Sequence, residues 1–282
     1  MNCQLPHSAT LRIVCGSVVG YAGDAIVNAA NQGCITGGGV DGAITKAGGK
    51  ALAAARRALP IVKGKTVRCP TGEAVITVGG DLKAKYCIHS VGPNYNVRAG
   101  WHVEDRDKKT TECDKLLYSS YRESMICARE AKLESVGFSL ISAGIFRGHR
   151  TLVTVLALGL EAIKRNSYAG LKEVALFAFN AKEEEALKTA ASVVFTKDEE
   201  DLRREVHAVA DIVENTESLV VTRRRKRKDT AKNDVDEMKT NAESTVSQQA
   251  QDSEAESEAK KEKKEETDLD SVTEDFSKKA KI

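Results

Sequence analysis

The chain has 282 residues, of which 41% are hydrophobic and 30% charged, and its formal net charge is +2. This near balance gives no electrostatic reason to expect a nucleic-acid-binding protein, and no stretch reaches the ~20 apolar residues that span a bilayer. The first residues lack the apolar core of a signal peptide. Seven cysteines without a C-x-x-C pair favour a reducing compartment and give no zinc-finger spacing. We therefore expect a cytoplasmic or nuclear protein with no membrane partner and no bound metal.

Apolar strands alternate with helical stripes up to about residue 194. The pattern predicts strands at residues 10–15, 25–30, 74–78, 86–91, 135–141 and 173–179. It predicts helices from residue 40, at 114–132, from residue 151 and at 183–193. Such alternation is typical of a layered α/β domain, which we place at residues 10–195.

The remainder of the chain has a different composition. Apolar residues recur at helical spacing from Leu202 to Ile212, so residues 196–214 are predicted to include an amphipathic helix. Residues 215–282 hold too little apolar surface to fold, which predicts a disordered charged tail. Six consecutive cations at 223–228 fit a nuclear import signal, a nucleic-acid patch or a solvated charge block. The acidic stretch that follows leaves only a weak case for nucleic acid as a partner.

The segment after the strand at 25–30 carries the most informative motif. Asn28 and Asn31 lie at the end of that strand, where ligand crevices form in open α/β sheets. Three glycines at 37–39 follow, and a helix is predicted to begin directly after them. Free N–H groups and the helix dipole attract anions there, and glycines let a ligand come close to the backbone. The segment therefore predicts a phosphate site with the Asp41 carboxylate beside it.

These glycines allow two other interpretations. Gly37, Gly39 and Gly42 fit the G-x-G-x-x-G pattern of dinucleotide-binding proteins. That pattern needs a tight turn directly after the strand and an acidic residue about 20 residues on. Here residues 31–36 intervene, and the next acidic residue along the chain from the helix start is Glu73, so the pattern is incomplete. The glycines could also be plain turn residues before a helix.

The strand at 135–141 leads into a second glycine-bearing loop. Ser142 follows the strand, and Gly144 allows the backbone to turn close to a phosphate. Phe146 can lie against a sugar face, and a helix is predicted from Thr151. Alone, this segment is an ordinary strand-to-helix connection. Together with the first loop, it predicts the other half of a phosphate clamp.

Four motifs stand in a fixed order along the chain. They are Asn-Ala-Ala-Asn at 28–31 with Gly-Gly-Gly-Val-Asp-Gly-Ala-Ile at 37–44, Cys-Pro-Thr-Gly-Glu-Ala at 69–74, Tyr-Cys-Ile-His-Ser-Val-Gly-Pro at 86–93, and Ser-Ala-Gly-Ile-Phe at 142–146. Their order resembles the macro domain family, in particular the branch that hydrolyses ADP-ribosyl and O-acetyl-ADP-ribosyl esters. The resemblance covers about residues 10–195. It implies a three-layer α/β/α fold with a central mixed sheet.

The same resemblance implies roles for individual residues. Asn31 would bind the distal ribose near the bond to be cleaved, and Asp41 would orient or activate the attacking water, with the diphosphate helping to position it. No cofactor or metal is implied. The substrate-binding residues implied by the resemblance are Ser17, Val18, Asn31, Gly38, Gly39, Val40, Ser142, Ala143, Gly144, Ile145, Phe146 and Asn180.

The chain also departs from the family's pattern. Ser17 stands where the family has an aspartate that accepts a hydrogen bond from adenine, which lowers the affinity to be expected. Thr45 stands where the family has a histidine, and Arg147 begins an unusual continuation of the second loop. Paired glutamates do not follow the glycines, so trimming of poly(ADP-ribose) is not expected.

Four further residues have chemistry of their own. His89 lies in an apolar strand and is expected to be a hydrogen-bonded core residue, whereas His149 is the better functional candidate. Cys34 and Cys69 could be reactive, but a buried free thiol is the commoner case.

The leading hypothesis is a hydrolase that removes ADP-ribose from acidic side-chain esters on proteins, deacetylates O-acetyl-ADP-ribose, or does both. Its partners would be small molecules containing ADP-ribose and mono-ADP-ribosylated proteins, and we expect a monomer. A reader module that binds ADP-ribose without turnover is the alternative. An RNA-binding adaptor that acts through the basic run is a third.

Overall fold

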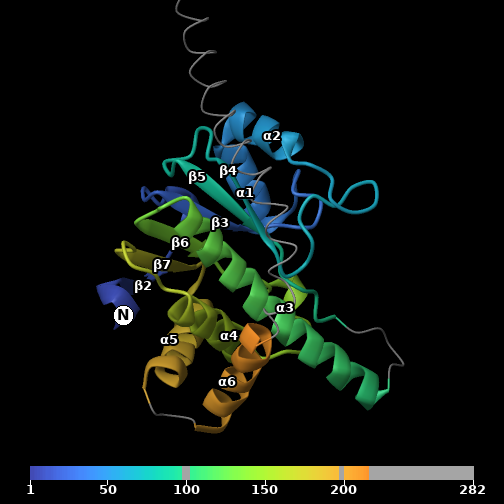
Figure 1. Cartoon of the computed structure of the whole chain (residues 1–282), viewed down its shortest axis with the longest axis vertical. Coiled ribbons are helices and arrows are strands. Elements are labelled where there is room, and N and C mark those ends of the chain that lie inside the picture. Colours follow the sequence, from blue (N-terminus) through green and yellow to red (C-terminus); the bar gives the residue numbers. More distant parts are fainter. Residues whose placement is uncertain (97–101, 197–199, 216–282) are drawn as a thin grey trace, which may run out of the picture. The chain divides into compact units, whose positions relative to one another are not determined.

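The computed structural model describes residues 1–96, 102–196 and 200–215. Within these ranges seven strands form one sheet with helices on both faces (Figure 1). The strands are β1 (Asn2–Gln4), β2 (Thr10–Cys15), β3 (Ala25–Ala29), β4 (Ala74–Val78), β5 (Tyr86–Ser90), β6 (Ser135–Ser139) and β7 (Glu173–Ala178). The α-helices are α1 (Gly39–Ala47), α2 (Gly49–Ala58), α3 (Val103–Glu130), α4 (Leu152–Arg165), α5 (Ala181–Phe195) and α6 (Glu200–Asn215). The predicted tail beyond residue 215, including the basic run at 223–228, lies outside the described residues.

The strand order is β1-β2-β7-β6-β3-β5-β4. The five inner strands run parallel to their neighbours, while β1 and β4 pair antiparallel at the two edges. The predicted mixed sheet is thus confirmed. All five inner strands end at the same side of the sheet, which is where open α/β folds bind their ligands.

Helices cover both faces of the sheet, which gives the predicted three-layer arrangement. On one face, α1 packs against β3 and α2 against β4. On the other face, α3 contacts β4 and β5, α5 contacts β2 and β7, and α4 lies between these two helices. Helix α6 packs on α3 and α4 and buries Val206, Val209 and Ala210 there. The folded unit therefore includes β1 and α6, which both lie outside the predicted limits of 10–195.

The predicted strands are confirmed to within two residues at each end, but two helices differ from expectation. Helix α3 begins at Val103 and not at residue 114, because its first turns are exposed and carry no apolar stripe to reveal them. Glu104 and Asp105 in the first turn favour this helix start through the helix dipole. Helix α2 was not predicted: it is short and rich in alanine, and its inner face buries Leu52, Ala55 and Arg56.

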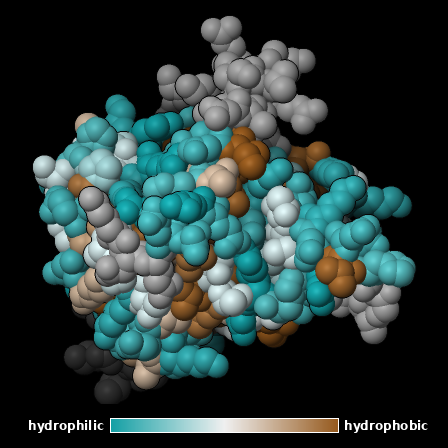
Figure 2. Space-filling model, turned by 90° about the horizontal axis from the view of Figure 1, so that it is seen from below, coloured by the Kyte–Doolittle hydropathy of each residue, from teal (hydrophilic) through white to brown (hydrophobic). Residues whose placement is uncertain are grey.

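The side seen in Figure 2 is mostly hydrophilic, and its hydrophobic residues gather in small groups. None of the helices in the described ranges combines the length and apolar character that crossing a membrane requires.

Candidate functional site

Two loops leave neighbouring strands at the carboxyl side of the sheet. The first loop, residues 30–38, connects β3 to α1. The second loop, residues 140–151, connects β6 to α4 and contains the short 3-10 helix η3 (Ile145–Arg147). Because β3 and β6 are paired in the sheet, both loops start side by side.

Asn31 closes the first loop on itself. Its Nδ2 donates to the carbonyl of Thr36 at 2.7 Å, and its Oδ1 accepts from the N–H of Gly33 at 3.0 Å. At the end of the loop, Gly39 has φ +56°, a left-handed conformation that favours glycine. These contacts hold the loop in shape where it runs into α1.

The start of α1 presents unpaired donors. Within the described ranges, the N–H groups of Gly39, Val40 and Asp41 donate to no other residue, as is usual in a first helical turn. A Cβ added to Gly38 would meet nothing within 4 Å, so packing does not explain this glycine. The backbone there is open to an incoming anion.

The second loop is anchored by neutral hydrogen bonds to residues 92–96. Ser142, at φ +54°, donates from Oγ to the carbonyl of Pro93 at 2.7 Å. The N–H of Tyr95 donates to the carbonyl of Phe146 at 2.8 Å, and Asn96 Nδ2 donates to the carbonyl of Ile145 at 2.9 Å. The carbonyls of this turn are therefore occupied.

The N–H groups of the same turn are not occupied. Across the part of the chain that the structure describes, those of Ala143, Gly144, Ile145 and Phe146 donate to no other residue. A Cβ at Gly144 would meet nothing within 4 Å, and Ile145 is 89% exposed. The second loop thus offers a second set of free backbone donors.

A cavity of about 420 Å³ lies between the two loops. Asn31 lines it from the first loop and Phe146, which is 38% exposed, from the second, so the structure brings these two predicted residues together. Sequence reasoning missed the other lining residues, although several belong to the recognised motifs or follow them directly. The others are Gln32, Gly33, Thr66, Val67, Thr71, Val91, Gly92 and Asn94.

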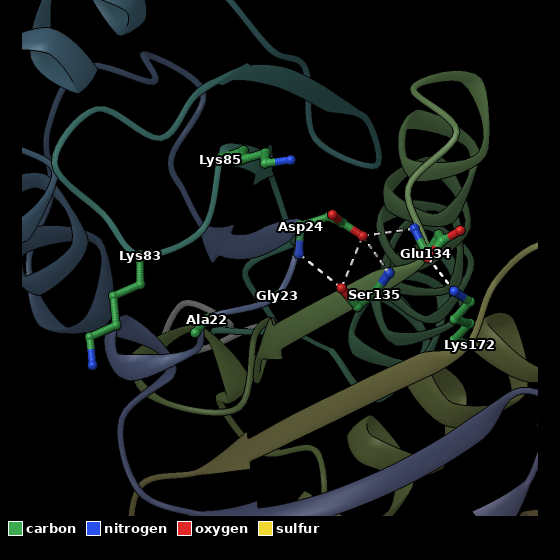
Figure 3. Close-up of a pocket in the computed structure, with 8 residues that line it drawn as sticks. All are labelled: Ala22, Gly23, Asp24, Lys83, Lys85, Glu134, Ser135 and Lys172. Atoms are coloured by element: carbon green, nitrogen blue, oxygen red, sulfur yellow. Dashed lines mark hydrogen bonds and ion pairs between the residues drawn. The ribbon is translucent and has the colours of Figure 1, made fainter.

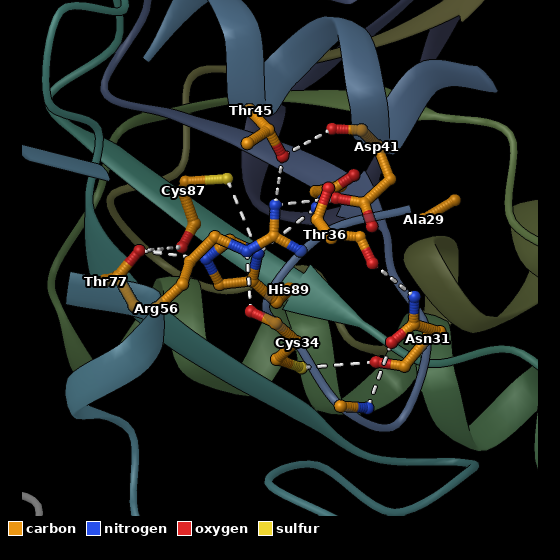
Figure 4. Close-up of polar contacts among 12 residues, drawn as sticks. Ala29, Asn31, Cys34, Thr36, Asp41, Thr45, Arg56, Thr77, Cys87 and His89 are labelled. Carbon is orange, nitrogen blue, oxygen red and sulfur yellow. Dashed lines mark hydrogen bonds and ion pairs between the residues drawn. The ribbon is translucent and has the colours of Figure 1, made fainter. Parts of the chain in front are cut away.

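Asp41 does not line this cavity. Its side chain lies behind the first loop and is 3% exposed (Figure 4). Asp41 Oδ1 accepts from Asn28 Nδ2 at 2.7 Å and forms an ion pair with Arg56 Nη1 at 2.7 Å. Its Oδ2 has no hydrogen-bond partner among the described residues and faces Gly37, where an added Cβ would stand 2.5 Å from Oδ2 and 3.2 Å from Asn31 Nδ2.

Sequence reasoning did not identify Arg56 as a residue of the site. It is fully buried, donates from Nε to the carbonyl of Cys34 at 2.6 Å and from Nη1 to Thr45 Oγ1 at 2.5 Å. The available signal is its position four residues after the buried Leu52, on the inner face of α2. The adjacent exposed Arg57 conceals that signal, because a pair of arginines suggests a solvated face.

His89 is confirmed as a hydrogen-bonded core residue. Its ring nitrogens lie 3.2 Å from Asn28 Nδ2 and 2.9 Å from Thr77 Oγ1. Complete burial, and next the charge of Arg56, lower the pKa of His89 to about 3. The imidazole is therefore neutral at ordinary pH. Cys34 and Cys69 are likewise confirmed as buried free thiols.

Ser17 and Asn180 also lie at the carboxyl side of the sheet, just after β2 and β7. Ser17 is exposed, and its Oγ accepts from the N–H of Val19 at 3.4 Å, while the Val18 side chain is buried. Asn180 Oδ1 accepts from the N–H of Glu183 at 3.0 Å and caps α5. This cap occupies the Asn180 oxygen and leaves Phe179, 77% exposed, as the prominent side chain at this end.

A second hollow of about 370 Å³ lies at the opposite side of the sheet (Figure 3). Its polar groups pair with one another. Asp24 accepts from the N–H groups of Glu134 and Ser135 at 2.9 and 3.0 Å, and Lys172 pairs with Glu134 at 2.6 Å. These hydrogen bonds lower the pKa of Asp24, although burial opposes them. Because this hollow lies at the amino ends of the strands and its acidic side chains are already paired, it is the weaker candidate.

Comparison with known proteins agrees with this geometry. The family model described as "Macro domain" matches residues 27–157. A macro domain-containing protein of Caldanaerobacter subterraneus subsp. tengcongensis is 40% identical over 185 residues, which is 64% of this chain and 94% of that protein. A macro domain-containing protein of Cupriavidus necator is 41% identical over 169 residues, 60% of this chain and 88% of the relative.

Solved structures give the same result. The Oceanobacillus iheyensis macrodomain with ADP has a TM-score of 0.57 at 28% identity, over 68% of this chain and 94% of that one. The Trypanosoma brucei macrodomain in complex with ADP-ribose has a TM-score of 0.52 at 28% identity, over 64% of this chain and 68% of that one. By its sequence motifs, its mixed α/β sheet and its relatives, this chain belongs to the macro domain family.

Proposed function

We propose that this protein binds ADP-ribose groups and hydrolyses the esters that link them to acidic side chains or to acetate. The observation that carries the proposal is the two sets of free backbone N–H groups, at 39–41 and 143–146, on loops that share one cavity. Each hydrogen bond from such a group to a charged oxygen contributes about 1.5–3 kcal/mol. Several of them suit a diphosphate and need no lysine.

Solved relatives support the choice of ligand. One similar structure holds ADP and another holds ADP-ribose. At the carboxyl side of the sheet, the adenine would lie near Ser17 and Phe179. The diphosphate would lie between the two sets of N–H groups. The distal ribose would then reach the cavity between Asn31 and Phe146.

The reaction adds water across the ester and yields a free carboxylate and an ADP-ribose hydroxyl. In this proposal Asp41 orients the attacking water through Oδ2, the oxygen that faces Gly37 and Asn31. Its other oxygen is held by Asn28 and Arg56. Because Arg56 balances the charge of Asp41, the pair places no net negative charge beneath the diphosphate.

The test is release of ADP-ribose from a protein carrying mono-ADP-ribosylated glutamate. We expect the wild type to release ADP-ribose and Asp41→Asn to do so about a hundredfold more slowly. Asp107→Asn, at an exposed position in α3, is the matched control and should behave as wild type. Equal rates for all three proteins would remove Asp41 from the mechanism, and no release by any of them would reject the hydrolase.

One observation favours the reader module as a second candidate. The Asp41 side chain is 3% exposed and already paired, so the charged group proposed to orient water is not open to the cavity. Calorimetry with ADP-ribose separates the candidates. Binding by the wild type without any release of ADP-ribose supports the reader, and binding with release supports the hydrolase.

The adenine end offers a test of the binding mode. Ser17→Asp would provide a carboxylate to accept from the adenine amino group, as in the family's pattern. We expect the affinity for ADP-ribose to rise about ten- to a hundredfold, because a charge-assisted hydrogen bond contributes about 1.5–3 kcal/mol. Calorimetry with ADP as well as ADP-ribose should show the same gain. An unchanged affinity for both ligands would place the adenine elsewhere.

A further inference from the structure

Arg56 joins three separate parts of the fold around Asp41. It lies on α2, and its guanidinium contacts the Asp41 and Thr45 side chains of α1 and the carbonyl of Cys34 in the first loop. Its relative exposure is 0%, so it touches neither solvent nor the cavity. Any effect of Arg56 on a ligand must therefore pass through its neighbours.

A buried guanidinium is costly unless its charge is balanced and its donors are paired. Here one carboxylate balances the charge at 2.7 Å, and the planar fork directs Nε and Nη1 to different acceptors, while Nη2 is buried without a hydrogen-bond partner among the described residues. This fixed geometry leaves the Asp41 carboxylate little freedom to rotate. Arg56 and Asn28 both take Oδ1, so Oδ2 is left facing Gly37 and Asn31.

Thr45 completes the arrangement. Its Oγ1 donates to the carbonyl of Asp41 at 2.8 Å and accepts from Arg56 Nη1 at 2.5 Å. Threonine stands here in place of the histidine of the family's pattern, and the structure gives that departure a role. Its hydroxyl connects the arginine to the first turn of α1.

We propose that Arg56 is the positioning residue for Asp41: it holds Oδ1 of the buried carboxylate and directs Oδ2 toward the first loop. This inference rests on the proposed hydrolase function. Without Arg56, the Asp41 carboxylate would lose the contact that fixes its orientation, and Oδ2 would orient water less well. The free N–H groups of the two loops would remain in place to bind the diphosphate.

The kinetic test compares Arg56→Met, Asp41→Asn and the double variant. We expect each single variant to lower kcat for ester hydrolysis about a hundredfold, with KM and the calorimetric Kd for ADP-ribose within about threefold of wild type. The double variant should fall no further than Asp41→Asn alone, because both changes act on the same carboxylate. Arg57→Met, at the adjacent exposed position, is the matched control and should match wild type.

Three results would overturn the inference. They are an unchanged kcat in Arg56→Met, a double variant slower than Asp41→Asn by the full factor of the Arg56 change, and a raised KM that accounts for the loss. If Arg56→Met alone does not fold, the double variant removes both buried charges, and its comparison with Asp41→Asn still decides the question.

Melting temperatures give a readout that needs no catalysis. Each single variant leaves one buried charge without its partner and should lower the melting temperature by roughly 10 °C, whereas the double variant should lose much less than the sum. Additive losses would show that the two residues are not coupled and would reject the inference. If the wild type proves inactive while the melting losses are non-additive, the hydrolase fails and the Arg56–Asp41 coupling stands.

Discussion

The two loops that bound the cavity are supported in different ways. Behind the first loop lies a buried polar network, in which Asp41 bonds to Asn28 and Arg56. The turn of the second loop is held by neutral bonds to residues 92–96, among them the one from Ser142 Oγ to a backbone carbonyl, and an ion pair between Arg150 and Asp114 holds only the end of that loop. The first loop should therefore respond to charge and pH. The turn of the second loop should respond to changes in volume at its backbone contacts.

Glycines in both loops show the same contrast. A Cβ at Gly37 would collide with a charged side chain, whereas one at Gly148 would stand 2.7 Å from backbone atoms of Tyr95. At Gly38 and Gly144, by comparison, an added Cβ would meet nothing within 4 Å. Each loop thus contains one glycine that the fold requires and another whose openness suits a ligand.

Among substitutions in the two loops, the largest effect on stability is expected at the backbone contact of the second loop. Gly148→Ala adds a methyl group against Tyr95 at a residue with φ +55° and ψ −128°. We expect a loss of about 3 kcal/mol in the free energy of unfolding, from this clash and from a positive φ that residues with a Cβ avoid. Urea unfolding measures it. Gly64→Ala, with φ +59° and nothing within 4 Å, is the control and should show the strain alone. Equal losses in the two variants would mean that the second loop tolerates the added volume.

Acid should weaken the support of the first loop. The pKa of His89 is lowered from 6.5 to about 3, first by burial and then by the charge of Arg56. Between these pH values the unfolded chain binds more protons than the native protein. The stability due to neutral His89 is thus complete above pH 6.5 and is lost progressively as the pH falls toward 3.

We expect this loss to be roughly 1.4 kcal/mol for each pH unit below about 6. Urea unfolding at several pH values across the window measures the slope. His89→Gln should flatten it, while His149→Gln, an exposed histidine of the second loop, should retain it. If the stability of His89→Gln depends on pH as steeply as that of the wild type, other groups cause the acid sensitivity.

A smaller effect is expected from crowding Asp41. Gly37→Ala would place a Cβ 2.5 Å from Asp41 Oδ2, and Arg56 and Asn28 leave that carboxylate little room to move. We expect kcat for ADP-ribose release to fall about tenfold while the affinity for ADP-ribose changes little, because a displaced oxygen no longer orients water well. Release assays and calorimetry together test this. A loss of affinity equal to the loss of rate would instead assign Gly37 to binding.

The smallest effect on stability is expected at Gly38. Its backbone is extended, with φ −94° and ψ 179°, and an added Cβ would meet nothing. Gly38→Ala should therefore unfold like the wild type, within about 0.5 kcal/mol. Its affinity for ADP-ribose should still fall about fivefold, because the methyl group occupies the approach of the diphosphate. Wild-type affinity would show that the ligand does not come close to this residue.

Much of the fold follows from local patterns. Alternating or continuous apolar residues reveal β2 to β7, and the motifs at 28–44 and 142–146 mark the two loops. The first turns of α3 escape detection because they carry no apolar stripe. The sequence suggests one apolar stripe on α4, but Thr154–Ile163 is buried all round, since α6 packs on it from outside.

Some residues of the site could likewise be recognised from the sequence, and others could not. Its glycines and asparagines can be recognised because backbone freedom and strand-end position are local properties of the chain. The distant partners of Asp41 and Asn28 cannot, because Arg56, which pairs with Asp41, comes from another helix, and His89, which contacts Asn28, comes from another strand. Whether an asparagine faces a ligand or its own loop also depends on the final backbone path, as the hydrogen bonds of Asn31 illustrate.

The sequence by itself determined the order of strands β2 to β7, the helices that follow the two loops, and the places where the backbone can approach an anion. Periodicity and glycine act within a few residues, so no distant contact is needed to detect them. The tertiary structure alone decided which N–H groups stay free, that Asp41 lies behind its loop, and that a buried arginine balances its charge. Those outcomes depend on side chains that only the folded sheet brings together.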